Sequence, residues 1–99
     1  MMQHTAGELA NMLKGEVDGD ATVVVHKLAK IENAATGSLT FLSNPDYEGH
    51  LYSTGASVAI VSRTFTPNQP LPPSLVLIRV EDAYAAFAQL LQMVSAAMA

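Results

Sequence analysis

Four short apolar runs, separated by turn-forming residues, constrain the fold of this chain more than any other feature. They cover residues 22–28, 39–42, 57–62 and 75–78, and they are rich in Val, Ile, Leu and Thr, as strands commonly are. Helix-start patterns precede, separate and follow these runs, and such alternation is typical of α/β domains. We therefore predict an α/β fold with a small mixed, partly parallel sheet and three short helices.

The first two helices are marked at their starts. Thr5 followed by Glu8 forms a capping-box pattern, which predicts a helix over residues 6–13 with Gly15 as the left-handed residue at its end. Asn44-Pro45 predicts the second start, because Asn is a favoured N-cap and Pro a favoured first helical residue. A nearby glycine follows each start, so both helices are expected to be short.

The third helix is unusual because no charged residue follows its expected N-cap, Asp82. An apolar stripe at helical spacing predicts its buried face: Tyr84, Phe87, Leu91 and Val94. The uncharged stretch is interrupted by glutamine and serine and falls short of the ~20 strongly apolar residues of a membrane span, so we expect none. The helix has no stop signal, so we expect the natural protein to continue and residues 1–99 to be a single excised domain.

Composition excludes several classes of function. The 99 residues include no cysteine, which rules out disulfides, zinc–thiolate sites and a cysteine nucleophile. Only 5 residues are Lys or Arg and the net charge is −4, so we expect no surface for nucleic acid or for an anionic membrane. The first residues do not resemble a signal peptide, and a cytoplasmic protein is the expectation.

No pattern in the sequence indicates a catalytic centre. The three histidines, His4, His26 and His50, are scattered, without a second histidine or a carboxylate at metal-ligand spacing on the same element. A P-loop, a G-x-G-x-x-G turn and a G-x-S-x-G elbow are all absent. We therefore expect no catalytic residue, no metal and no cofactor in these 99 residues.

One segment has the residue types and spacing of a binding site. Phe41 ends a predicted strand, Asn44 follows three residues later, and Tyr47 follows after three more. Residues three apart on a helix share a face, and α/β sheets place ligands at strand ends. Two rings could form a slot for a flat ligand, with the amide of Asn44 on a base edge such as that of uracil. On spacing alone, a core Phe41, a capping Asn44 and a half-buried Tyr47 are favoured.

Within these patterns the chain resembles the N-terminal domain of the UDP-3-O-acylglucosamine N-acyltransferases of bacterial lipid A synthesis. The most specific matches are F-L-S-N-P-x-Y over residues 41–47 and D-x-Y-x-A-F-A-x-L-L over 82–91. The resemblance implies that Phe41 and Tyr47 sandwich a uracil ring and that Asn44 forms a hydrogen bond to its edge. Related sequences often carry Lys at the position of Asp46, so we expect no phosphate contact from this carboxylate.

The resemblance also implies a larger enzyme around this domain. Such enzymes transfer a 3-hydroxyacyl chain from acyl carrier protein to the 2-amine of UDP-3-O-acylglucosamine. Their catalytic histidine lies in a left-handed β-helix of hexapeptide repeats, which also forms a homotrimer. Residues 1–99 contain no such repeat, so we expect this domain to bind the nucleotide sugar without catalysing its reaction and to be monomeric or weakly self-associating alone.

Two alternatives remain open at this point. The first is the N-terminal domain of a Mur-type peptidoglycan ligase, which also binds a UDP-sugar but leads into an ATP-binding P-loop domain. The second is a packing or oligomerisation module without a ligand, which the charge-poor last helix would suit. In that module Phe41 would be fully buried, with no slot between its ring and that of Tyr47.

Overall fold

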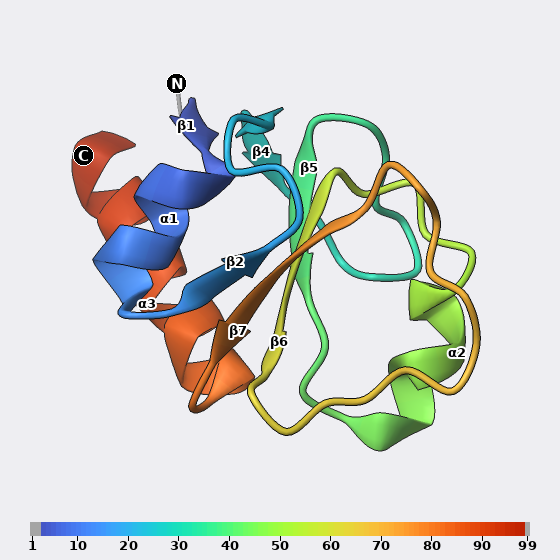
Figure 1. The fold of residues 1–99 in the computed structure, drawn as a ribbon. Coiled ribbons are helices and arrows are strands. Elements are labelled where there is room, and N and C mark those ends of the chain that lie inside the picture. Colours follow the sequence, from blue (N-terminus) through green and yellow to red (C-terminus); the bar gives the residue numbers. More distant parts are fainter. Residues whose placement is uncertain (1–2, 99) are drawn as a thin grey trace.

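The computed structural model describes residues 3–98, and the side chains of residues 3–92. Its strands are β1 (His4–Thr5), β2 (Glu16–Asp18), β3 (Val24–Val25), β4 (Lys27–Leu28), β5 (Ser38–Phe41), β6 (Val58–Ser62) and β7 (Val76–Val80). Its helices are α1 (Ala6–Leu13), the 3-10 helix η1 (Pro45–Tyr47), α2 (Glu48–Leu51) and α3 (Ala83–Met98). These elements confirm the predicted α/β class (Figure 1).

The main sheet is mixed and mostly parallel. Its strand order is β2-β7-β6-β5-β4, and β2 is the antiparallel member at one edge. The pairs β4–β5, β5–β6 and β6–β7 are parallel, so Phe41 lies opposite Ile60 and Ile60 opposite Ile78. A separate two-stranded ladder joins β1 to β3. The carboxyl ends of the four parallel strands therefore meet at one edge of the sheet.

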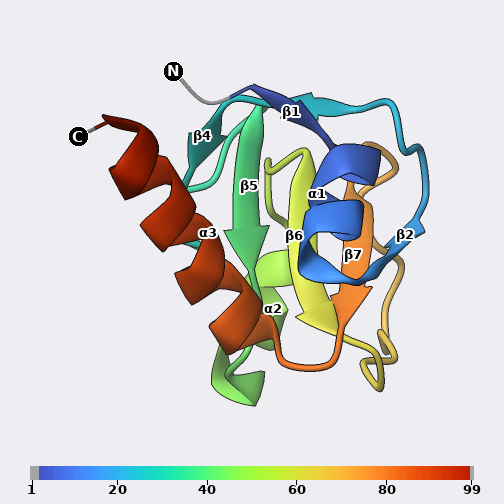
Figure 2. The same ribbon diagram turned by 90° about the vertical axis from the view of Figure 1, so that its left-hand side faces the viewer.

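Helices cover both faces of this sheet, because the central strands are apolar on both sides. Helices α1 and α3 lie on one face and α2 on the other (Figures 1 and 2). Along β6, Ile60 belongs to the core under α1 and α3, whereas Ala59 and Val61 belong to the core under α2. This alternation of neighbouring side chains explains why one short strand contributes to two hydrophobic clusters.

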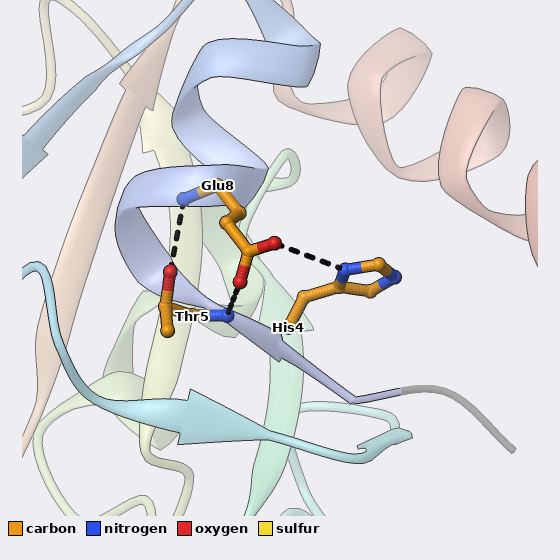
Figure 3. A network of polar contacts seen from close by, with 3 residues as sticks. All are labelled: His4, Thr5 and Glu8. Atoms are coloured by element: carbon orange, nitrogen blue, oxygen red, sulfur yellow. Dashed lines mark hydrogen bonds and ion pairs between the residues drawn. The ribbon is translucent and has the colours of Figure 1, made fainter.

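Helix α1 begins with the predicted capping box and spans the predicted residues. Thr5 donates its backbone N–H to Glu8 Oε1 over 3.0 Å, and Glu8 donates its N–H to Thr5 Oγ1 over 3.1 Å (Figure 3). The predicted C-terminal residue was wrong, however. Lys14 takes the left-handed conformation, with φ 58°, and donates its N–H to Asn11 O.

Gly15 has a different reason for being glycine. A Cβ atom at this position would lie 2.7 Å from the carbonyl oxygen of Arg79 and 2.7 Å from Val80 Cγ1. Both distances are shorter than real contacts of a Cβ atom, so a side chain would push the turn after α1 away from β7. Close packing against the sheet, and not backbone conformation, therefore explains this glycine.

Two further expectations differ from the structure. The predicted strand over 22–28 is interrupted at His26, because β3 pairs with β1 whereas β4 pairs with β5. The predicted stripe on α3 was also wrong: Phe87 is buried, but Tyr84 and Leu91 are 66% and 48% exposed. The buried face of α3 consists instead of Ala83, Ala86, Phe87 and Leu90. The stripe's last member, Val94, lies outside the described side chains.

The N-cap of α3 follows the prediction. Asp82 Oδ1 accepts a hydrogen bond from the backbone N–H of Ala85 over 3.1 Å. Within residues 3–98, no helix is both long enough and apolar enough to cross a membrane.

Candidate functional site

A cavity of about 300 Å³ opens at the carboxyl ends of β4 and β5. All three residues singled out in the sequence line it: Phe41, Asn44 and Tyr47. The rest of the lining is Lys30, Ile31, Leu42, Ser43 and Tyr84. Lys30 and Ile31 follow β4, the residues from 41 to 47 follow β5, and Tyr84 comes from the first turn of α3. Parallel strand order therefore brings separate segments to one place, as in other α/β sheets.

Phe41 belongs partly to the core and partly to the cavity. Its ring stacks on that of Phe87, with centroids 4.2 Å apart and an interplanar angle of 25°. The ring packs against the core cluster under α3, but the residue is only half-buried and lines the cavity. Phe87 thus covers one face of Phe41, and part of the residue remains exposed at the cavity.

Asn44 is a helix cap that also lines the cavity. Its Oδ1 accepts a hydrogen bond from the backbone N–H of Asp46 over 3.0 Å, which caps η1. The side chain is exposed, and this is the one hydrogen bond it makes within the described residues. An amide oxygen has two lone pairs, so Oδ1 can accept a second bond while the NH₂ group donates to a ligand.

Tyr47 lies at the end of η1 and is 47% exposed. Its ring centroid is 6.0 Å from that of His50, with the two rings tilted by 38°. Because Pro45 starts the 3-10 helix shortly after the end of β5, the chain turns tightly enough for Tyr47 to line the cavity with Phe41.

Two residues of the lining were not predicted from the sequence as part of the site. Tyr84 falls in the stripe expected to be buried, but its ring stands at 73° to that of Phe41 with centroids 6.3 Å apart. Lys30 carries no sequence signal; it is the one cation among the described residues that line the cavity. Only the docking of α3 across β5 and the pairing of β4 with β5 bring these side chains to the site (Figure 2).

Two larger hollows, of about 490 and 430 Å³, are lined by described residues that include no Phe or Tyr. The larger of the two adjoins the cavity at Leu42 and Ser43, and its Asp82 caps α3. His4 Nδ1 lies 4.0 Å from Glu8 Oε2, a pair that was not predicted (Figure 3). Among the described side chains, no three acidic or histidine residues gather in a way that could hold a metal ion.

The fold and the cavity define a class: a small α/β domain with an aromatic-lined cavity at the carboxyl edge of its parallel strands. Comparison with known proteins identifies the family. The model of the family LpxD, UDP-3-O-(3-hydroxymyristoyl) glucosamine N-acyltransferase, matches residues 22–93. The chain therefore belongs to this acyltransferase family.

Curated relatives agree with this assignment. The UDP-3-O-acylglucosamine N-acyltransferase of Christiangramia forsetii is 50% identical over 91 residues, and that of Cytophaga hutchinsonii is 47% identical over 91 residues. Each match covers 92% of this chain and 26% of the relative. The protein of the same name from Porphyromonas gingivalis is 43% identical over 93 residues. The chain thus spans about a quarter of the length of the relatives it matches.

Proposed function

We propose that residues 1–99 form the domain that binds the uridine part of the substrate in a UDP-3-O-acylglucosamine N-acyltransferase. The observation that carries this proposal is the cavity at the end of β5, which Phe41, Asn44 and Tyr47 line together. The names of the relatives supply the substrate class, a UDP-linked acylglucosamine. A flat base and a negatively charged diphosphate are the parts of such a ligand that this site would recognise.

The chemistry of the lining suits a nucleotide with a small base. Stacking of a base on an aromatic side chain contributes about 1–3 kcal/mol. The amide of Asn44 can offer a donor and an acceptor to a base edge, which in uracil carries an N–H beside a carbonyl. Lys30 provides positive charge at the rim of the cavity for the phosphates, whereas the exposed carboxylate of Asp46 is unsuited to that contact.

The proposal extends to the whole protein by way of its family. The intact enzyme would transfer a 3-hydroxyacyl chain from acyl carrier protein to the 2-amine of UDP-3-O-acylglucosamine, in the cytoplasm and within lipid A synthesis. A β-helix domain outside these residues would supply the catalytic histidine and the contacts of a homotrimer. The present domain would hold the nucleotide end of the substrate and contribute no reacting group.

The structure favours a binding domain over a packing module. A packing module requires Phe41 to be fully buried, but Phe41 is half-buried and lines the cavity together with Tyr47. The family match also leads away from a Mur-type ligase, because the matching family and the relatives named above are all N-acyltransferases.

An NMR titration of the 99-residue chain with UMP, CMP and AMP tests the proposal. We expect UMP to shift the amide resonances of residues 41–47 at lower concentration than the other two nucleotides do. Tyr47→Ala should abolish or strongly weaken the response, and it leaves the core intact because Tyr47 is 47% exposed. Phe41→Ala should do the same, with its fold checked separately because its ring packs on Phe87.

Weak binding alone would not contradict the proposal, because a Kd of 1 mM still corresponds to about −4 kcal/mol. The absence of any response to UMP at tens of millimolar would overturn it. An equal response to all three nucleotides would overturn the assignment of the base.

A further inference from the structure

We propose that Tyr84 is the side wall of the base site and sets the size of ring that the site accepts. This inference rests on the proposed function and adds a specificity-determining residue to it. Tyr84 belongs neither to the β5–η1 segment nor to the three residues implied by the resemblance. It reaches the cavity from α3, a different part of the chain.

Tyr84 is exposed and does not belong to the hydrophobic core under α3. Its side chain is 66% exposed, the highest value among the large hydrophobic residues of the described chain. Its ring nevertheless lines the cavity and contacts Phe41 edge-on, with centroids 6.3 Å apart. A ligand that fills the cavity would cover this exposed ring.

Helix α3 sets this geometry through two residues one turn apart. Phe87 stacks on one face of Phe41 at 4.2 Å and 25°, so a ligand can stack only on what remains of that ring. Tyr84 stands at 73° to the plane of Phe41. A base stacked parallel to Phe41 would therefore meet Tyr84 nearly at right angles, so Tyr84 acts as a lateral barrier and not as a second stacking plate.

A lateral barrier has two measurable consequences. An edge-to-face aromatic contact contributes about 0.5–1.5 kcal/mol, so its loss should weaken UMP binding about 2- to 12-fold. Its loss should also favour a larger ring, because a purine extends further sideways than a pyrimidine when both stack on the same surface. The ratio of the Kd for AMP to the Kd for UMP should therefore fall.

The test compares Tyr84→Ala with a matched variant of the same helix, Leu91→Ala. Leu91 lies two turns further along α3, is 48% exposed and does not line the cavity. NMR titrations with UMP and AMP should show weaker UMP binding and a lower AMP/UMP Kd ratio for Tyr84→Ala, and wild-type values for Leu91→Ala. Tyr84→Phe retains the ring and should bind within about twofold of the wild type.

The outcomes separate the two proposals. If the wild type does not respond to UMP, the proposed function fails. If the wild type binds UMP and Tyr84→Ala matches Leu91→Ala in both Kd values, the side wall is refuted and the proposed function stands. If Tyr84→Phe behaves like Tyr84→Ala, the hydroxyl and not the ring makes the contact, which also refutes the wall. Circular dichroism of each variant shows whether its fold is retained.

Discussion

Among single residues, Asn44 belongs both to a helix cap and to the cavity, and only its Oδ1 takes part in the cap. Its Oδ1 caps η1 through the N–H of Asp46, while its NH₂ group makes no hydrogen bond within the described residues. A variant that preserves the oxygen but replaces the NH₂ group can therefore separate folding from binding.

We expect Asn44→Asp to unfold near the wild-type temperature, because Asp is an equally good N-cap. Its affinity for neutral uridine should fall, since the donor group is lost. Asn44→Ala should lose the affinity and about 1 kcal/mol of stability as well. Thermal melts and uridine titrations of both variants measure the two effects; wild-type affinity of Asn44→Asp would exclude the amide donor from binding.

Thr40 differs from Asn44 because its side-chain hydroxyl forms no hydrogen bond with a described residue. Its Oγ1 is buried without a hydrogen-bond partner among the described residues. Its side chain lies on the sheet face opposite to Leu39 and Phe41, as does that of Ala59, its partner in register. Nothing in the structure explains this hydroxyl.

We expect Thr40→Val to raise the free energy of unfolding by about 1 kcal/mol, because Val has nearly the same shape and removes the unpaired hydroxyl. Ser38→Ala on the same strand is the control. Ser38 Oγ accepts a hydrogen bond from the N–H of Ala35 over 3.2 Å, so this variant should be destabilised. Urea unfolding compares both, and a destabilised Thr40→Val would indicate a partner for Oγ1.

Among the secondary-structure elements, α1 has specific contacts at both ends. Its N-terminus has the capping box, and its C-terminus passes closely over β7 at Gly15. Arg63 donates from its guanidinium to the carbonyl oxygen of Lys14 over 2.8 Å, which provides a partner for the end of the helix. These contacts make α1 sensitive to pH at one end and to side-chain volume at the other.

The capping box predicts an acid-sensitive contribution to stability. Hydrogen bonding to Thr5, first through its backbone N–H and then through its side chain, lowers the pKa of Glu8 below its ordinary value. A carboxyl with a lowered folded-state pKa stabilises the fold above its unfolded pKa, and this contribution is lost as pH falls through the folded pKa. Glu8→Gln keeps the hydrogen bonds without titrating, so its melting temperature should fall less between pH 7 and pH 3 than that of the wild type.

Glu32→Gln is the control for Glu8→Gln, because Glu32 is an exposed carboxylate outside the helices. An equal loss of melting temperature in the wild type and in Glu8→Gln would contradict the prediction. Hydrogen bonds from the hydroxyl and the backbone N–H of Thr22 lower the pKa of Asp20. Asp20 should therefore make the same acid-sensitive contribution to stability in both variants.

Two glycines should respond to alanine in opposite ways. Gly15→Ala places a Cβ atom 2.7 Å from Arg79 O and should destabilise the fold by about 1–3 kcal/mol. Gly49 lies inside α2, and no atom lies within 4 Å of the place that a Cβ would take, so Gly49→Ala should stabilise by about 0.5–1 kcal/mol. Chemical denaturation measures both; a neutral Gly15→Ala would show that the turn after α1 moves freely.

In the molecule as a whole, one sheet separates two small cores, and the cavity lies where its parallel strands end. The core under α1 and α3 includes Leu9 and Phe87, and the core under α2 includes Leu51 and Leu77. The site therefore depends on both faces: Phe41 packs on α3, which carries Tyr84, whereas Ile31 and Leu42 belong to the core under α2.

We expect the 99-residue chain, of 10.5 kDa, to be monomeric or weakly self-associating and to lack acyltransferase activity. In the proposed function, the trimer contacts and the catalytic histidine belong to a β-helix domain outside these residues. Light scattering measures the mass, and an assay with UDP-3-O-acylglucosamine and acylated carrier protein measures activity. A stable trimer, or turnover by the isolated chain, would contradict the proposed separation of binding from catalysis.

The local features of this protein could be predicted from its sequence. The capping box of α1, the Asn44 cap of η1 and the Asp82 cap of α3 depend on residues a few positions apart, and all three are confirmed. The spacing of Phe41, Asn44 and Tyr47 singles out their segment in the same way. Hydrogen bonds and side-chain contacts within one turn follow from spacing, so the sequence displays them directly.

Contacts between distant parts of the chain became visible only in the folded molecule. The break at His26, the glycine at 15 and the true buried face of α3 all depend on strands and helices that are far apart in sequence. Lys30 and Tyr84 join the cavity for the same reason. Strands pair and helices dock so that the whole chain exposes as little apolar surface as possible. A local sequence pattern therefore does not specify which residues end up beside a site.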